Sequence, residues 1–325
     1  SAFNGCANLN NITIPDSVTE IGEKAFAECK SVKSLTLPKN ITVINGSTFY
    51  GCRGLCGEIV IPSGVTYIGE SAFGDCGIES IVIADGVKGI SNYAFGGCSN
   101  LKRIKMPISA SINFDTSYNN RESFDGCSSI EEVIFTAGRD GMPGNGADKS
   151  YHQLFSGSRA TLKSIRFEEG IKTIPEGICY ECGALTSVYL PSTLTSIGRS
   201  AFNGCANLNN ITIPDSVTEI GEKAFNCTAI TDVYFGGTKE QWKMITIKSY
   251  NDPLKNAVIH YTDAVPSDLN GDGKVNVMDL IRLKRHIADG TEVVGNADVN
   301  GDGKVNVMDL IRLKRYIAGE AVDIH

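Results

Sequence analysis

Aspartate and asparagine side chains recur at fixed intervals near the end of the sequence, where they could bind a metal ion. In residues 268–279 they occupy loop positions 1, 3, 5, 9 and 12, and a glycine stands at position 6, where the chain must turn sharply. Position 7 would contribute its backbone carbonyl, and position 9 can act through a water molecule. Oxygen donors at this spacing are typical of Ca²⁺ sites. The predicted ligands of this first ion are Asp268, Asn270, Asp272, Lys274, Asn276 and Asp279.

A second loop of the same kind follows thirty residues later. Residues 268–288 and 298–318 are identical at 19 of 21 positions, and the two differences are Leu269/Val299 and His286/Tyr316. A single such loop could be a chance turn, but two in tandem predict two bound Ca²⁺ ions. The predicted ligands of the second ion are Asp298, Asn300, Asp302, Lys304, Asn306 and Asp309.

Each loop leads into a segment whose apolar residues have helical spacing. Leu280, Leu283 and Ile287 fall on one face of the first predicted helix. Their counterparts in the second unit, which should pack against them as a small core, are Leu310, Leu313 and Ile317. Pro266 lies just before the first loop. The first unit therefore has a loop and an exiting helix, but it lacks the entering helix of an EF-hand.

These half-hands, each followed by Leu-Ile-Arg-Leu-Lys-Arg, resemble a type I dockerin over residues 268 to about 318. The resemblance implies a small all-α domain that folds with two Ca²⁺ ions and docks onto the cohesin domain of a scaffoldin. It also implies an extracellular place in a bacterial cellulosome-like assembly. Dockerins contact cohesin through loop positions 10 and 11 and through the later Lys-Arg pair. The matching residues are Val277, Met278, Lys284, Arg285, Val307, Met308, Lys314 and Arg315.

Alternatives to cohesin contact stay open for these residues. The basic ones could form a solvated helix face, and Val277 and Met278 could cap the helix or enter its core. The apolar Val-Met pair stands where some dockerins carry hydroxyl residues, so the choice of cohesin is also open. Because both units present the same side chains, the domain has near two-fold symmetry, which predicts two binding orientations rotated by about 180°.

Through the rest of the chain a phenylalanine recurs, mostly every 22 to 24 residues. Cys179 stands where one phenylalanine is missing, which makes ten copies, and residues 1–26 and 200–225 are identical. One copy cannot bury its apolar residues alone, whereas stacked copies cover one another, so the pattern predicts a solenoid with a continuous core. The recurring positions are Phe3, Phe26, Phe49, Phe73, Phe95, Phe124, Phe155, Phe202 and Phe225.

Within each copy the residues predict a short strand followed by a turn. Ile12 and Ile14 alternate as in a strand, and Pro15 ends it because proline has no donor for the ladder. The Ile-x-Ile-Pro, Ile-Gly and Ala-Phe-x-x-Cys elements resemble BspA-type leucine-rich repeats, which are found on bacterial surface and secreted proteins. The resemblance covers residues 1–261. It implies an α/β-type leucine-rich repeat solenoid of short strands, turns and short helical segments.

The predicted domain order follows from where the repeat stops. Residues 1–261 form the solenoid, and the break in its period at 234–242 is similar to the end cap of such arrays, which places the cap near 234–261. A cap is needed because the last copy would otherwise expose its apolar face. Residues 262–267 are a predicted linker, and residues 268–325 are the predicted dockerin domain.

The cysteines follow the repeat and not a disulfide pattern. The chain has eleven, most of them three residues after the phenylalanine position. Stacking would place them near the strand spacing of about 4.7–4.9 Å, somewhat beyond the Cβ separation that a disulfide prefers, so most should be buried and reduced. Two disulfides stay open as alternatives, one between Cys52 and Cys56 and one between Cys179 and Cys182. A zinc site at Cys179 and Cys182 has little support, because no second ligand pair follows.

Composition and motifs limit the function. A net charge of −7 argues against nucleic-acid binding, which needs a basic stripe. No apolar run approaches the roughly 20 residues of a membrane helix. The four histidines share no motif, and no nucleophile or phosphate-binding signature stands out, so the chain is predicted not to be an enzyme. The alternatives are an accessory fragment of a larger secreted enzyme and a surface adhesin.

The solenoid is predicted to bind a protein or a polysaccharide. Insertions at 108–123 and 137–153 lengthen the steps beside Phe124 to 29 and 31 residues. Long loops on a rigid array often carry binding residues. The residues best suited to contact a ligand there are Phe114, Tyr118, Tyr151 and His152. The alternative is that both insertions are tolerated surface loops.

Overall fold

The computed structural model divides the chain into two compact units. One comprises Ser1–Val233 with Ile245–Val258, and the other comprises Tyr234–Met244 with Ile259–His325. The residues that the structure describes are 1–112, 122–139, 141, 143, 151, 154–261, 267–270, 275–291, 293 and 296–324. Most of the expected linker lies outside them, so the domain limits at 261 and 268 stay a prediction.

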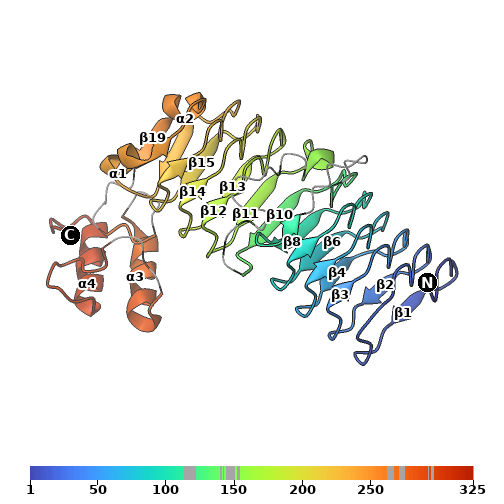
Figure 1. Ribbon diagram of the computed structural model, residues 1–325. Coiled ribbons are helices and arrows are strands. Elements are labelled where there is room, and N and C mark those ends of the chain that lie inside the picture. The colour runs from blue at the N-terminus through green and yellow to red at the C-terminus, as the bar shows by residue number, and fades with distance from the viewer. Residues whose placement is uncertain are drawn as a thin grey trace. The chain divides into compact units, whose positions relative to one another are not determined.

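A strand of three to five residues from each coil lies on one face of the repeat array (Figure 1). These strands are β1 (Asn11–Thr13), β2 (Ser34–Thr36), β4 (Glu58–Ile61), β6 (Ser80–Ile83), β8 (Arg103–Pro107), β10 (Glu132–Thr136), β11 (Ser164–Phe167), β13 (Ser187–Tyr189), β15 (Asn210–Ile213), β17 (Asp232–Phe235) and β19 (Val258–Tyr261). Six of them, β4-β6-β8-β10-β11-β13, form one sheet, and its neighbours pair in parallel. Smaller sheets join β1 with β2, and β15 with β17 and β19.

A second ladder of two-residue strands runs along the same coils. It consists of β3 (Val43–Ile44), β5 (Tyr67–Ile68), β7 (Gly89–Ile90), β9 (Ser111–Ile112), β12 (Thr173–Ile174), β14 (Ser196–Ile197), β16 (Glu219–Ile220) and β18 (Thr246–Ile247). These strands form two parallel four-stranded sheets, β3-β5-β7-β9 and β12-β14-β16-β18. The predicted leucine-rich repeat solenoid of short strands and turns is confirmed.

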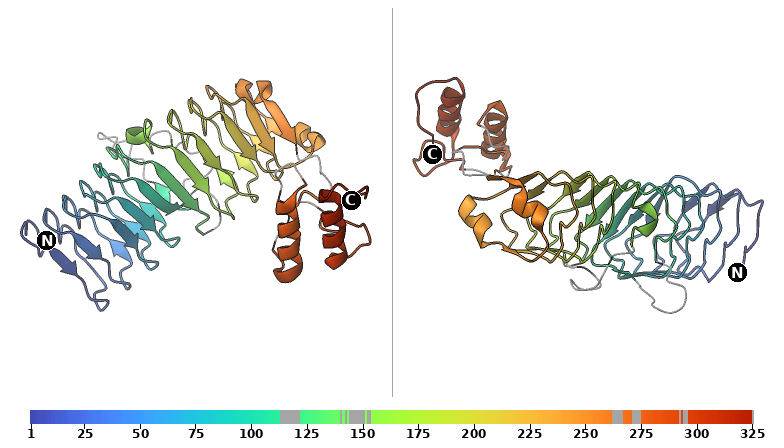
Figure 2. Two further views of the ribbon diagram at one scale, coloured as in Figure 1. Left: turned by 180° about the vertical axis from the view of Figure 1, so that it is seen from behind. Right: turned by 90° about the horizontal axis from the view of Figure 1, so that it is seen from above.

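Helices are few and short in the repeats. The described helical segments are a 3₁₀ turn at Ser156–Ser158, α1 (Lys239–Met244), α2 (Asp252–Asn256), α3 (Val277–Asp289) and α4 (Val307–Ile317). No helix among the described residues is both long and apolar enough to cross a membrane. The paired helices α3 and α4 lie side by side in the C-terminal unit (Figure 2).

The core of the array is a ladder in which each repeat position stacks on itself. Consecutive phenylalanine rings from Phe3 to Phe124 are stacked, with centroids 5.1 to 5.6 Å apart. The step from Phe124 to Phe155, where an insertion lengthens the repeat, widens to 6.5 Å and the rings tilt by 33°. Cys179 takes the next position and is fully buried. The long strands show the predicted alternation, since the inward residues Ile59 and Ile61 are 2% and 0% exposed.

The cysteine ladder supports the coils with sulfur hydrogen bonds. Cys52 Sγ donates to Phe26 O at 3.2 Å, and Cys76 Sγ donates to Phe49 O at 3.1 Å, so each thiol joins its own coil to the one before. All eleven cysteines are free and eight are buried, which confirms the predicted packing role. Cys52 and Cys56, and likewise Cys179 and Cys182, are not joined by disulfides.

After β5, β14 and β16 a glycine follows the isoleucine of the second ladder, where neighbouring backbones approach closely. A Cβ atom on Gly69 would lie 2.7 Å from the backbone nitrogen of Gly46 in the coil before. The same holds for Gly221, whose Cβ would lie 2.6 Å from Arg199 N. Any side chain at these positions would force the coils apart.

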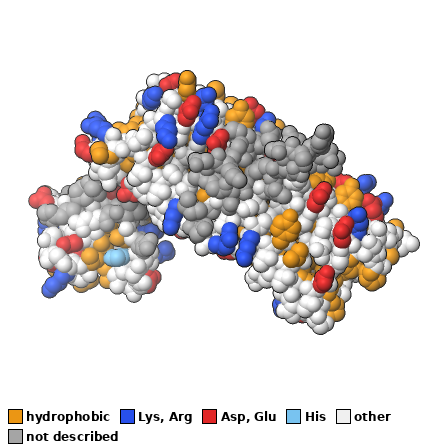
Figure 3. Space-filling model, in the orientation of Figure 1, with side chains coloured by type: hydrophobic (Ala, Val, Ile, Leu, Met, Phe, Trp, Pro, Cys, Tyr) orange, Lys and Arg blue, Asp and Glu red, His pale blue; other side chains and the backbone are white. Residues whose placement is uncertain are grey.

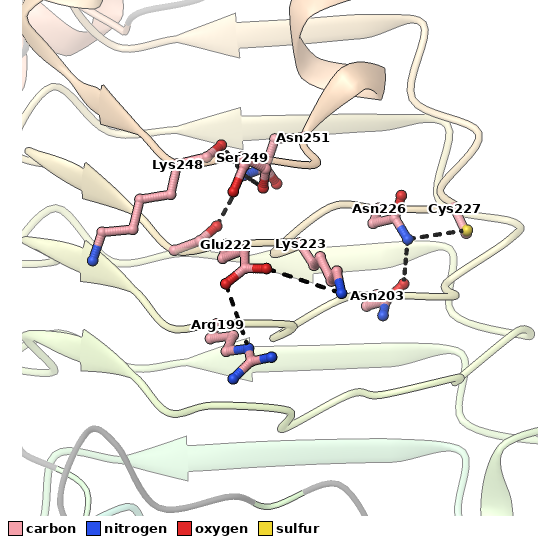
Figure 4. Close-up of polar contacts among 10 residues, drawn as sticks. Arg199, Asn203, Glu222, Lys223, Asn226, Cys227, Lys248, Ser249 and Asn251 are labelled. Carbon is pink, nitrogen blue, oxygen red and sulfur yellow. Dashed lines mark hydrogen bonds and ion pairs between the residues drawn. The ribbon is translucent and has the colours of Figure 1, made fainter.

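The array ends in a set of polar contacts (Figure 4). Asn251 is fully buried, and its Nδ2 donates to Gly221 O and Lys248 O, both at 2.9 Å. On the surface nearby, Asn226 Nδ2 donates to Asn203 Oδ1 at 3.2 Å. Asn251 lies within residues 234–261, the region predicted to contain the cap, whereas Asn203 and Asn226 lie before it.

The insertions contribute little to the described surface. Phe114, Tyr118 and His152 lie outside the described residues. Tyr151 is 2% exposed, so it belongs to the core and the prediction that it contacts a ligand is wrong.

Candidate functional site

The two helices of the C-terminal unit begin with the same capping box. Asn276 Oδ1 accepts from Met278 N, and Asp279 Oδ2 accepts in return from Asn276 N, both at 2.8 Å. Asn306 and Asp309 make the equivalent pair of bonds, again at 2.8 Å. The residues at loop positions 9 and 12 therefore also cap the N-termini of the two helices. Asn-x-x-Asp before an apolar helix was a sequence signal for this cap, because it resembles a capping box.

The aspartate at position 12 of each loop is fully buried. Asp279 and Asp309 are both 0% exposed. Asp279 Oδ1 accepts from Leu269 N at 2.8 Å and from Asn270 N at 3.0 Å, while Asp309 Oδ1 accepts from Asn300 N at 3.1 Å. Each carboxylate thus ties the start of its loop to the start of its helix. The backbone N–H groups satisfy part of each buried carboxylate, and a nearby cation would offset its negative charge.

The second loop is described in full, and its side chains turn inward. Asp298 Oδ1 accepts from Gly301 N at 2.9 Å, and Asp298 Oδ2 accepts from Gly303 N at 2.7 Å. Asn300 Oδ1 accepts from Asp302 N at 2.9 Å, and Asp302 Oδ1 accepts from Lys304 N at 2.9 Å. Gly303, at position 6, has a φ of 81°, which is the left-handed turn that favours glycine.

The donor set of this loop fits a hard cation. Every predicted side-chain ligand offers a carboxylate or amide oxygen, and Lys304 offers its carbonyl, as Ca²⁺ prefers. Among the described residues, no three His, Cys, Asp or Glu side chains already gather as a metal cluster. The loop oxygens that accept backbone N–H groups keep further lone pairs, with which they could also bind a cation.

The first loop is described only in part. Asp268, Asn270, Asn276 and Asp279 are described, and Asp268 is 5% exposed. Asp272 and Lys274 lie outside the described residues. The assignment of ligands in both loops therefore stays a prediction.

A small apolar core joins the two helices. Its fully buried members are Leu269, Leu283, Val299 and Leu313, with Ala297 at 8% exposed. Leu280, Leu310 and Ile317 pack partly buried against it, as predicted. Ile287 does not, since it is 39% exposed, and its predicted core role is wrong. The sequence analysis missed Leu269 and Val299, which enter the core from position 2 of each loop.

The residues expected to dock form an exposed apolar row at the start of each helix. Val277 and Met278 are each 56% exposed, and Val307 and Met308 are 58% and 54% exposed, so a core role for these residues is excluded. The sequence analysis missed a third member of each row. Ile281 and Ile311 are 41% and 46% exposed and follow the valines by four residues, which places them on the same helix face.

The Lys-Arg pairs are exposed but not equivalent. Lys284, Arg285, Lys314 and Arg315 all lie on the surface. Arg315 Nε contacts Glu320 Oε2 at 2.6 Å, and Glu320 belongs to the segment after α4. A left-handed glycine follows each helix, Gly290 with a φ of 74° and Gly319 with a φ of 79°, but in the first unit His286 Nδ1 also lies 2.8 Å from Thr291 O.

Coils of about 23 residues stacked in parallel, with a paired-helix unit at the C-terminal end, define a leucine-rich repeat protein with an appended helical domain. The chain belongs to the BspA-type leucine-rich repeat family. The family model described as "BspA type Leucine rich repeat region (6 copies)" matches residues 1–102, 56–139 and 150–257. A second model, the dockerin type I domain, matches residues 266–318. Both resemblances drawn from the sequence are confirmed, and both modules are non-catalytic.

Several solved structures are similar to this chain. A leucine-rich repeat protein from Bacteroides ovatus is 21% identical over 81% of this chain and 86% of its own, with a TM-score of 0.35. A leucine-rich cell surface protein from Faecalibacterium prausnitzii is 25% identical over 74% and 83%, with a TM-score of 0.32. One from Eubacterium ventriosum is 24% identical over 68% and 59%, with a TM-score of 0.43. No curated protein matches the chain.

Proposed function

We propose that this chain is a secreted, non-catalytic component of a cellulosome-like assembly, attached by its C-terminal domain. That domain docks onto the cohesin domain of a scaffoldin, and the repeat array serves as a protein or carbohydrate interaction module. The observation that best supports docking is the pair of apolar rows on α3 and α4. Every side chain in these rows is more than 40% exposed: Val277, Met278 and Ile281 on α3, and Val307, Met308 and Ile311 on α4. Burying them against a partner would recover hydrophobic free energy at roughly 25 cal/mol per Å².

Calcium is the structural partner of this docking surface. Type I dockerin domains bind calcium, and the duplicated loops support two ions in this chain. Each ion would be held by the six predicted positions of its loop and would offset the charge of buried Asp279 or Asp309. Since those two aspartates also cap the helices, metal binding would order the helix starts that carry Val277 and Val307.

The basic residues complete the proposed interface. Lys284 and Arg285 in the first unit, and Lys314 and Arg315 in the second, would contact acidic groups on cohesin. Because the two helices carry the same side chains, the domain could engage cohesin in two orientations related by its internal two-fold symmetry.

A calcium-dependent pull-down with purified scaffoldin cohesins tests this function. We expect binding in Ca²⁺ that is lost in excess EGTA, and that is also lost in a variant carrying aspartate at Val277, Met278, Val307 and Met308. Val60→Asp is the matched control, because Val60 is 55% exposed but lies on the array. Failure to bind any cohesin in the presence of Ca²⁺ would overturn the proposal.

A further inference from the structure

The long-strand ladder opens between β13 and β15. In neighbouring coils the residue before the strand donates to the coil before it, as Thr186 N does to Lys163 O at 3.0 Å and Thr231 N does to Asn209 O at 2.9 Å. The corresponding bond from Asn209 N to Thr186 O is not formed, and β13 and β15 belong to different sheets. The same coils stay joined on the other ladder, where β14 pairs with β16. The coils therefore separate only on the long-strand face.

A groove of about 650 Å³ lies over this opening. Its floor includes Val188 and Leu190, which are half-buried, whereas the matching residues Ile211 and Ile213 of the next coil are 2% and 0% exposed. The opening thus makes core positions accessible from outside. A volume of this size falls within the range of about 300–1,000 Å³ that is usual for ligand sites.

The ring of Tyr189 lines the groove, and Arg166 packs against it. Tyr189 is 49% exposed, and the guanidinium carbon of Arg166 lies 4.1 Å from its ring centroid. The two residues face each other in the β11–β13 register, so Arg166 covers the ring on the β11 side. The ring stays exposed beside β15, where the residue in the same repeat position is Thr212, a small side chain that also lines the groove.

The rim of the groove offers uncharged polar groups. Ser187, Asn210 and Thr212 line it with hydroxyl and amide groups. Its two carboxylates are already engaged, because Glu168 Oε1 contacts Lys105 Nζ at 2.7 Å and Glu169 Oε2 accepts from Ser192 Oγ at 2.9 Å. Figure 3 shows acidic and basic side chains interspersed over the last coils of the array.

We infer that this groove binds a neutral saccharide. The C–H face of a pyranose ring packs on the open face of Tyr189, and its hydroxyl groups bond to Ser187, Asn210 and Thr212. An extended peptide inserted as a new strand would need β13 and β15 about 9.4–9.8 Å apart. Their Cα atoms lie within 8 Å, which leaves no room for a strand. This inference rests on the proposed role of the array as an interaction module; the ligand of the array is then a neutral saccharide, bound in the groove between β13 and β15.

Affinity electrophoresis of the full chain tests the site, with gels containing a soluble β-glucan, a xylan, a galactomannan or an acidic polygalacturonate. We expect retardation by at least one neutral polysaccharide and at least a tenfold loss of affinity in Tyr189→Ala. The double variant Asn210→Ala/Thr212→Ala should lose at least threefold. Its matched control is Asn11→Ala/Thr13→Ala, which makes the same changes in the identical copy at residues 1–26 and should bind as the parent does.

Three results would overturn the inference: no retardation by any neutral polysaccharide, retardation by the acidic one alone, or binding that Tyr189→Ala leaves unchanged. Thermal unfolding of each variant shows whether the array is intact. Cohesin binding is measured on the same samples. Because the proposed cohesin interface lies on α3 and α4, a parent chain that binds cohesin but no neutral polysaccharide would reject this site and not the docking function.

Discussion

The side-chain Oδ1 of Asn251 accepts a hydrogen bond from the backbone N–H of Phe225 at 2.9 Å. In the coil before, a backbone carbonyl takes this role, since Phe202 N donates to Ala224 O at 2.8 Å. The Nδ2 group of Asn251 satisfies two carbonyls of the last coils as well. One buried side chain therefore replaces the backbone of a further coil, and the ladder can end without leaving its polar groups unpaired.

Asn251→Leu should destabilise the array by at least about 2 kcal/mol, because it leaves a buried N–H and two carbonyls without their partner. Urea unfolding of the full chain, followed by circular dichroism, measures the change. The control is Asn226→Ala, which removes a partly exposed bond to Asn203 and should cost less than about 1 kcal/mol. Equal losses in the two variants would contradict the capping role.

The thiols should fall into two classes of reactivity. Cys6, Cys56 and Cys227 are exposed, and the other eight cysteines are buried. Burial also raises the pKa of the Cys76 and Cys179 thiols well above their usual value, which disfavours the reactive thiolate. Titration with Ellman's reagent at pH 8 should detect three thiols in the folded chain and eleven in guanidinium. More than three fast-reacting thiols in the folded chain would show that the ladder opens.

Calcium titration should reveal two sites in the C-terminal unit. Isothermal titration calorimetry of chelator-treated protein should give two ions per chain, and Asp302→Ala should reduce this to one, because it removes a charged ligand of the second loop only. Asp323→Ala, an exposed aspartate outside both loops, should leave two. Excess EGTA should lower the helical signal, since Asp279 and Asp309 link the loops to the helix caps. A stoichiometry that Asp302→Ala leaves at two would reject the ligand assignment.

Cohesin should tolerate the loss of either basic pair. Replacing Lys284 and Arg285, or Lys314 and Arg315, by alanine should each weaken binding less than about fivefold, because the other orientation remains. Replacing all four should weaken it about 100-fold or more. The ion pair of Arg315 with Glu320 makes the two units unequal. Because an exposed ion pair is worth at most about 1 kcal/mol, we expect only a small preference for one binding orientation over the other. A large loss from one pair alone would exclude the dual mode.

One carboxyl group should make the stability of the array depend on pH near neutrality. Burial, with a smaller contribution from Asp125, raises the pKa of Glu122 to about 7, although Arg159 opposes the shift. An unfolded glutamate has a pKa of about 4.3. The folded state therefore favours the protonated acid, and the stability it supplies below about pH 4.3 is lost as the pH rises through 7. The gain in melting temperature of Glu122→Gln over the parent should grow from pH 5 to pH 8, and an equal gain at both would contradict this.

Local repetition made much of this molecule predictable. The phenylalanine and cysteine positions recur at a fixed interval, and each stacks on its own copy, so the sequence predicted both the coil and the buried, reduced thiols. The predicted calcium loops were recognisable because their oxygen donors lie within twelve consecutive residues. Such patterns depend on neighbours in sequence or on the next repeat.

The prediction failed where identical residues have different surroundings. Ile287 and Ile317 occupy the same position in two nearly identical units, yet the first is 39% exposed and the second packs against the core, because different segments follow their helices. Tyr151 was expected on an exposed loop and is buried.

The sequence by itself determined the repeat, the core ladder, the two modules and the oxygen donors of the predicted calcium loops, because each depends on residues that recur at short, fixed spacings. Only the tertiary structure decided where the ladder opens and how it ends. Asn210 and Thr212 are the same residues as Asn11 and Thr13, yet they line a groove because the coil before them carries Tyr189 and fails to pair. Asn251 acts as a cap because folding places it against Phe225, 26 residues away along the chain.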